Sequence, residues 1–87
     1  MLNKDVRSRL ISFFYQLAMQ NGYDGKASNF QMPNFLSHDD IARLIGAARQ
    51  TVTSFLAELE KEKLVIADRK KISIPDVKKL QQLATIG

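Results

Sequence analysis

Four polar side chains in the middle of the chain are spaced so that they form one hydrogen-bonding surface. They are Arg49, Gln50, Thr53 and Ser54, at positions i, i+1, i+4 and i+5. On a helix this spacing places all four on one side. In the major groove of DNA, Arg pairs bidentately with guanine and Gln with adenine. We therefore expect these residues to read base edges, provided that the rest of the domain leaves this side exposed.

An apolar stripe indicates how that helix is held. The stripe consists of Val52, Phe55, Leu56 and Leu59, at i, i+3, i+4 and i+7. Because it lies opposite the polar side, we expect it to pack on the core, with Phe55 as its central residue. A helix can enter a groove of DNA only when one side is anchored and the other is free.

A shorter helix is predicted directly before this one. Ser37 with Asp40 three residues later resembles a capping box, with Asp in place of the usual Glu. The apolar face that follows consists of Ile41, Leu44 and Ile45. Gly46 then interrupts the helix, and two helices joined by a tight glycine-containing turn form a helix-turn-helix. The motif spans about residues 37–63.

The flanking segments predict the remaining elements of a small, mainly α domain. We expect a helix over residues 3–21, a short strand within 30–36, a hairpin of 64–67 and 72–74, and a final helix that begins at Pro75-Asp76. Pro33 cannot donate a ladder hydrogen bond, so the strand that contains it belongs at a sheet edge. The hairpin, over about residues 64–74, would form a wing beside the helix-turn-helix.

Positive charge near the polar side suggests contacts with phosphates. No acidic residue occurs in 41–57, whereas Arg43 and Arg49 lie in that window. The hairpin tip carries Arg69, Lys70 and Lys71. These cations could lie on phosphates beside the groove. They could equally belong to a solvated turn that prevents edge-to-edge pairing, and the sequence leaves both interpretations open.

The acids that follow have a simpler interpretation. Glu58, Glu60 and Glu62 lie farther along the second helix, away from the expected groove. Their pattern indicates a solvated helix surface.

Composition limits the classes of function. The chain has 87 residues, which is enough for one domain, and a formal net charge of +4, which favours a polyanionic partner. The absence of cysteine excludes disulfides, thiolate metal sites and iron–sulfur clusters within the chain. No apolar run approaches the roughly 20 residues of a membrane span, and no signal peptide is visible. We therefore expect a cytoplasmic protein with no membrane contact.

The single histidine does not indicate an enzyme. His38 is followed by Asp39 and Asp40, a combination that could suggest acid–base or metal chemistry. The chain has no second His and no Gly-rich phosphate loop, and acids in the first turn of a helix favour its dipole. We expect no catalytic residue, no metal site and no cofactor in this chain.

The central segment resembles the helix-turn-helix of the cyclic-AMP receptor protein/FNR family of bacterial transcription regulators. This segment comprises residues 37–66, SHDDIARLIGAARQTVTSFLAELEKEKLVI. The shared features are a polar cap followed by an acidic residue, Ile41-Ala42, Gly46 in the turn, and Arg49-Gln50-Thr51-Val52 at the start of the second helix. Residues 5–10 also resemble the leading helix of the family's DNA-binding domain, and 72–84 its final strand and helix. The resemblance covers nearly the whole chain.

The resemblance implies a winged helix-turn-helix domain over residues 1–87 that binds double-stranded DNA. It implies that base edges are read by Arg49, Gln50 and Ser54. It implies that the residues near phosphates include Ser37, His38 and Thr51. Many members have Glu where this chain has Gln50 and Arg where it has Ser54, so a target sequence does not carry over. Ala48 occupies the expected N-cap of the second helix, where Ser or Thr is favoured, so that helix start is expected to be less well fixed.

The family's regulators also contain an N-terminal effector-binding β-barrel and a long dimerisation helix, which this chain lacks. The resemblance therefore implies that these residues correspond to the C-terminal third of such a regulator, with RNA polymerase as a further candidate partner. One alternative remains, a winged helix that serves as a protein–protein interaction module. A DNA reader leaves the surface around Arg49 exposed and positive, whereas an interaction module shows an apolar patch there.

Overall fold

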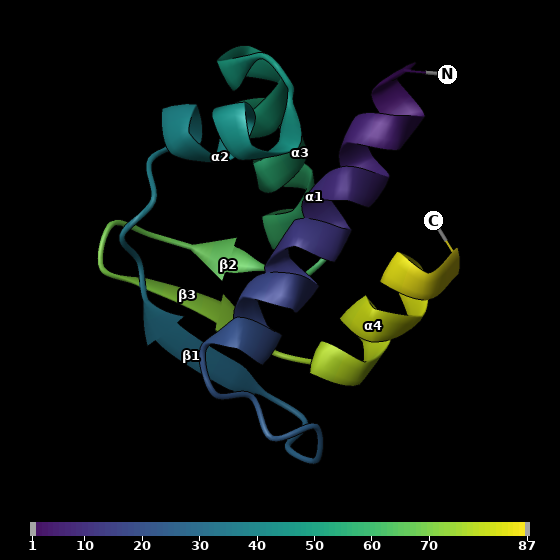
Figure 1. Cartoon of the computed structure of the whole chain (residues 1–87), viewed down its shortest axis with the longest axis vertical. Helices are drawn as coiled ribbons and strands as arrows, with labels where there is room; N and C mark the ends of the chain where they lie inside the picture. The colour runs from purple at the N-terminus through teal and green to yellow at the C-terminus, as the bar shows by residue number, and fades with distance from the viewer. Residues whose placement is uncertain (1, 87) are drawn as a thin grey trace.

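The computed structural model describes the backbone of residues 2–86 and the side chains of residues 6–84. In this part of the chain the elements are α1 (Leu2–Gln20), β1 (Phe30–Pro33), α2 (His38–Ile45), α3 (Arg49–Lys61), β2 (Ile66–Ala67), β3 (Lys71–Ile74) and α4 (Val77–Ile86), as Figure 1 shows. This order confirms the prediction of a mainly α winged helix-turn-helix with short strands.

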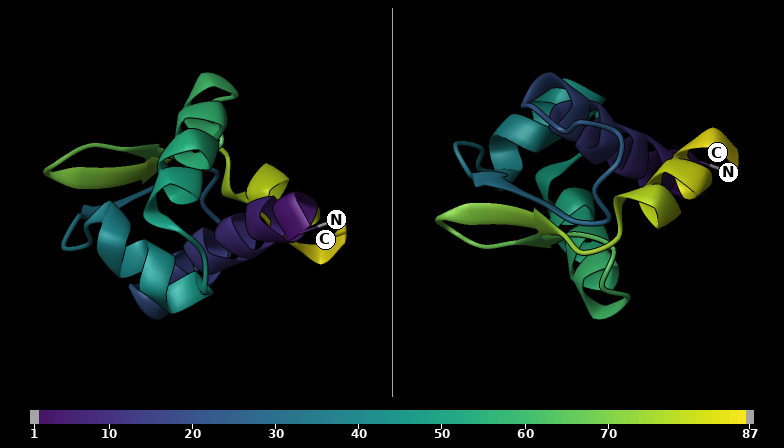
Figure 2. Two further views of the ribbon diagram at one scale, coloured as in Figure 1. Left: turned by 90° about the horizontal axis from the view of Figure 1, so that it is seen from above. Right: turned by 90° about the horizontal axis from the view of Figure 1, so that it is seen from below.

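The three strands of the described residues form one antiparallel sheet in the order β1-β3-β2. β1 pairs with β3 from Phe30 opposite Ile74 to Pro33 opposite Lys71, so the proline lies in an edge strand, as predicted. The β2–β3 hairpin, with its turn, is the wing (residues 66–74). Figure 2 shows the wing projecting from the helices on the side away from both chain ends.

The end of α3 explains why β2 is shorter than the sequence predicts. Lys63 has a left-handed backbone (φ 60°). Its amide donates to the Glu60 carbonyl at 3.0 Å, and the Leu64 amide donates to the Leu59 carbonyl at 2.9 Å. This is the Schellman pattern of a helix C-terminus. The Leu64 amide is therefore used in the C-terminal hydrogen bonds of α3, and the strand begins only at Ile66.

The core lies between α1, α3, the sheet and α4. Each of these elements contributes side chains that are almost completely inaccessible, among them Leu10, Phe14, Val52, Leu59, Ile72, Ile74, Val77 and Leu80. The longest helix, α1, lies beside α4 and also contacts α2 and α3. It is therefore the support against which the helix-turn-helix is placed.

Two predicted core residues are not buried as expected. Leu44 is 63% exposed, because the buried side of α2 is formed by Ile41, Ala42 and Ile45 and lies about a third of a turn away. On α3 the buried residues are Val52, Leu56 and Leu59, which places Phe55 at the border of the stripe, half-buried. Phe55 is thus not the central residue of this face.

The burial of α3 generates a stability prediction. Leu59→Ala removes a fully buried side chain, so it should lower the free energy of unfolding by roughly 2–5 kcal/mol. Phe55→Ala should cost less, about half of the roughly 3–5 kcal/mol expected for a fully buried Phe. Urea denaturation followed by circular dichroism measures both. A larger loss for Phe55→Ala than for Leu59→Ala would show that this assignment of the buried face is wrong.

Candidate nucleic-acid interface

The outer side of α3 is open to solvent over its first two turns. Arg49, Gln50, Thr53 and Ser54 are all exposed. The N-cap residue Ala48 makes no side-chain capping hydrogen bond, and the first turn contains no acidic residue. The predicted weak cap is therefore confirmed, and the positive end of the helix dipole is not offset by an acid from α3 itself.

The start of α2, in contrast, is firmly capped. The Ser37 hydroxyl accepts from the Asp40 amide at 3.0 Å, and the Ser37 amide donates to Asp40 Oδ2 at 2.9 Å. These reciprocal bonds confirm the predicted capping box. The hydrogen bond from the Ser37 amide has the largest effect on the Asp40 carboxyl, and the Ser37 hydroxyl adds to it. Together they hold the pKa of this carboxyl below its usual range.

The turn between α2 and α3 is held from α1. Gly46 is left-handed (φ 73°), a backbone conformation that favours glycine. Beside it, Arg9 Nη1 donates to the Ile45 carbonyl at 2.7 Å, which places a cation at the negative end of α2. The angle between the two helices is therefore fixed both by the turn and by a side chain from the supporting helix.

Two consecutive residues of α2 reach across to the outer side of α3. His38 Nδ1 lies 2.8 Å from the Thr53 hydroxyl. An Asp39 carboxylate oxygen lies 3.8 Å from the Arg49 guanidinium. The sequence did not predict the contact between Asp39 and Arg49, since periodicity within one helix carries no information about the partner across a turn.

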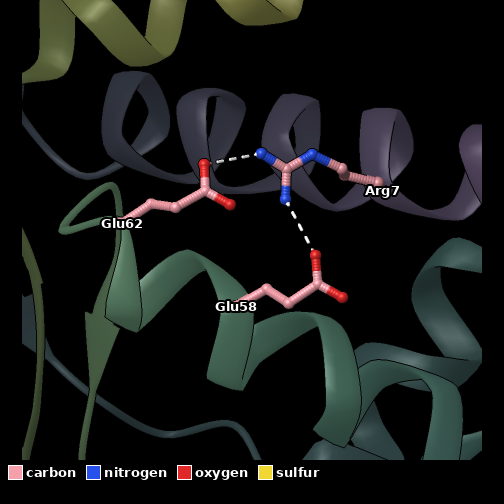
Figure 3. Close-up of polar contacts among 3 residues, drawn as sticks. All are labelled: Arg7, Glu58 and Glu62. Carbon is pink, nitrogen blue, oxygen red and sulfur yellow. Dashed lines mark hydrogen bonds and ion pairs between the residues drawn. The ribbon is translucent and has the colours of Figure 1, made fainter.

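A second ion-pair cluster joins α1 to α3. Arg7 lies 2.8 Å from Glu62 and 3.4 Å from Glu58, and the two glutamates are one turn apart (Figure 3). Glu58 and Glu62 are exposed, as their pattern predicts, and both also pair with Arg7 of α1. Sequence reasoning missed this role of Arg7. The contacts join residues 51 and 55 positions apart in the sequence, so no pattern within one element indicates them.

The wing tip is ordered by one carboxylate. Asp68 Oδ1 accepts the amides of Lys70 and Lys71, each at 2.8 Å, and these two bonds lower the pKa of Asp68. Asn34, which the sequence did not single out, donates from its side chain to the Asp68 carbonyl at 2.7 Å. The tip thereby keeps a defined shape while Arg69 and its two lysine neighbours stay exposed.

The structure brings the start of α2 and the wing to one surface. A hollow of about 360 Å³ lies between them. Its lining includes the N-cap Ser37 and His38 at the start of α2 and Asp68 and Arg69 of the wing, together with several apolar side chains. The other candidates for phosphate contact are separate: Arg43 is exposed on α2, and Thr51 is partly buried in α3. The candidate interface therefore consists of the outer side of α3, flanked by the start of α2 and the wing.

The large exposed apolar side chains of the described residues are Met19, Phe35 and Leu44, and none of them belongs to α3. Phe35 lies in the segment before α2, between two residues that line the hollow, Asn34 and Leu36. Within the same part of the chain, no three His, Asp or Glu side chains come together as metal ligands. No described helix has the length and apolar character needed to span a membrane.

The carboxylates of Asp40 and Asp68, which accept backbone amide hydrogen bonds, generate a pH prediction. Because the folded-state pKa values of Asp40 and Asp68 are lowered, their contribution to stability is present above the ordinary Asp pKa and is lost as the pH falls through the lowered values. Thermal melting should therefore shift downward below about pH 4. The double variant Asp40→Asn/Asp68→Asn should show a weaker dependence between pH 5 and pH 2. Equal slopes for both proteins would contradict this account.

Comparison with known proteins identifies the family of this chain. The family model described as "Crp-like helix-turn-helix domain" matches residues 8–83. The global nitrogen regulator of Nostoc sp. is 36% identical over 72 residues, which are 83% of this chain and 32% of that protein. The global nitrogen regulator of Synechocystis sp. is 32% identical over 83 residues, covering 95% of this chain and 36% of that protein. The chain thus spans about a third of the length of the curated relatives it matches.

Solved structures give the same result for the fold. The CO-dependent transcription factor CooA from Carboxydothermus hydrogenoformans, in its imidazole-bound form, matches with a TM-score of 0.79 and 27% identity over 95% of this chain and 38% of that chain. Reduced CprK without ligand matches with a TM-score of 0.76 and 26% identity over 88% of this chain and 36% of that chain.

Proposed function

This chain belongs to the family of Crp-like helix-turn-helix domains, and from that premise we propose that it is the DNA-reading domain of a bacterial transcription regulator. In this proposal α3 enters the major groove of double-stranded DNA and the wing lies beside it. One observation carries the proposal: α3 is anchored through Val52, Leu56 and Leu59, while its opposite side is exposed and polar.

We assign base reading to the exposed residues of the first two turns, Arg49, Gln50, Thr53 and Ser54. Their chemistry supports the assignment, since Arg pairs bidentately with guanine and Gln with adenine, and Ser and Thr hydroxyls can bond to donors or acceptors on any base edge. The start of a recognition helix is also where base contacts usually occur.

Phosphate contacts are assigned to groups around the base-reading side of α3. From the helices these are Ser37, His38, Arg43 and Thr51, and from the wing Arg69, Lys70 and Lys71. For the wing, the sequence left a solvated turn as an alternative. Phosphate binding is favoured by the defined shape of the tip, which holds the exposed side chains of Arg69, Lys70 and Lys71 close together.

The remaining parts of the function follow from the length of the relatives. Since the chain spans about a third of their length, we propose that the effector-binding and dimerisation regions of the regulator lie outside these residues. RNA polymerase is a further proposed partner and the cytoplasm the proposed location. No feature of α3 favours a protein–protein module, because the exposed large apolar side chains of the described residues lie outside α3.

Loss of a base contact and loss of phosphate contacts should change DNA binding in different ways. Arg49→Ala removes a group that distinguishes bases, so it should weaken binding to a preferred duplex by about 5- to 150-fold, and to random DNA far less. Lys70→Ala/Lys71→Ala removes contacts that carry no sequence information, so it should weaken all duplexes alike. It should also flatten the log–log salt dependence by up to about two units.

The measurement is fluorescence anisotropy at several salt concentrations, after selection of a preferred sequence from a pool of random duplexes. Lys78→Ala/Lys79→Ala is the matched control, because it removes two exposed charges from α4, away from the wing. If Arg49→Ala kept both the preferred sequence and its margin over random DNA, α3 would not be the recognition helix.

A further inference from the structure

The acidic side chain beside the proposed base reader offers no donor to a base acceptor or a phosphate. The Asp39 carboxylate lies 3.8 Å from the Arg49 guanidinium, with the side chains 53% and 67% exposed. A negative charge on a surface that faces DNA costs affinity for every sequence. Its position next to Arg49 therefore calls for a compensating advantage.

The backbone fixes where Asp39 stands. It lies in the first turn of α2, directly after His38, and the reciprocal bonds between the N-cap Ser37 and Asp40 hold this turn in place. The preceding residue, His38, contacts Thr53, one turn farther along α3 than Arg49. One turn of α2 thus contacts two groove-facing residues on successive turns of α3. The approach of Asp39 to Arg49 is a consequence of how the two helices cross.

We propose that Asp39 is a specificity-determining residue that holds the Arg49 guanidinium over the base-reading side of α3. The inference rests on the function proposed above. A long, free Arg side chain next to DNA binds whichever phosphate it reaches, and such contacts are independent of sequence. Asp39 competes with the phosphates for this cation and so lowers binding to non-cognate DNA.

The guanidinium can keep this partner while it reads a base. It has five N–H donors in a planar arrangement, so one edge can stay on a carboxylate while two other donors face guanine O6 and N7. Specificity is a difference of affinities, and it rises when binding to the wrong partner is penalised. Asp39 therefore reduces overall affinity and increases the margin between cognate and non-cognate sequences.

Asp39→Asn tests the proposal, because it removes the charge and keeps the size of the side chain. The probes are a fluorescein-labelled duplex selected from a random pool and a scrambled duplex of the same composition. The variant should bind the scrambled duplex more tightly. The ratio of the two affinities should fall by about 1.4- to fivefold, the coupling typical of an exposed ion pair.

A double-mutant cycle with Arg49 separates this role from general repulsion. In the Arg49→Ala background, Asp39→Asn should leave the affinity ratio unchanged. The matched control Glu60→Gln removes one exposed charge from α3 and should strengthen binding to both duplexes alike. If Asp39→Asn also strengthened both duplexes alike, with or without Arg49, Asp39 would be only a repulsive charge and the proposal would be overturned.

The outcomes also distinguish this inference from the proposed function. If the unmodified chain selected no sequence from the random pool, the DNA-reading function and this inference would both be wrong. If it selected a sequence and Asp39→Asn left the affinity ratio unchanged, the function would stand and the role of Asp39 would be refuted. A lower ratio that depends on Arg49 would support both.

Discussion

The packing of one side of α3 on the core is the interaction on which the rest of the structure depends. Val52 and Leu59 are completely buried and Leu56 nearly so. Because these side chains fix the rotation of the helix about its axis, they also determine which residues face outward. The exposed polar side is thus a consequence of the buried one, and any rotation would expose apolar surface while hiding the hydrogen-bonding groups.

The supporting helix α1 adds polar contacts that refine this placement. Arg9 caps α2 through the Ile45 carbonyl, and Arg7 pairs with two glutamates on the later turns of α3. Each pair is partly exposed and contributes modestly to stability. Together they restrain both helices of the motif against the same support. Recognition by direct hydrogen bonds requires this kind of restraint, because side chains that can shift would bind several different bases equally well.

Much of the fold could be predicted from the sequence, since apolar spacing reports the period of each element. The capping box, the edge strand with Pro33, and the basic wing were all visible in this way. The errors at Leu44 and Phe55 have one cause: in short helices, a few apolar residues define the centre of the buried face only to within about one position.

The contacts that shape the candidate site could not be predicted in this way. Asp39–Arg49, His38–Thr53 and Asn34–Asp68 each join two different elements. Their formation depends on the angle and distance at which those elements meet, which no pattern within a single element encodes. For this reason the residues of the proposed interface were found from the sequence, whereas the partners that position them were not.

Amide chemical-shift changes in the ¹⁵N-labelled chain, titrated with the selected duplex, test the central claim most directly. The account predicts the largest changes at residues 37–39, 49–54 and 68–71, with α4 little affected. Changes centred instead on the groove between α1 and α2, where Phe13 and Leu44 lie, would contradict a recognition surface built on α3.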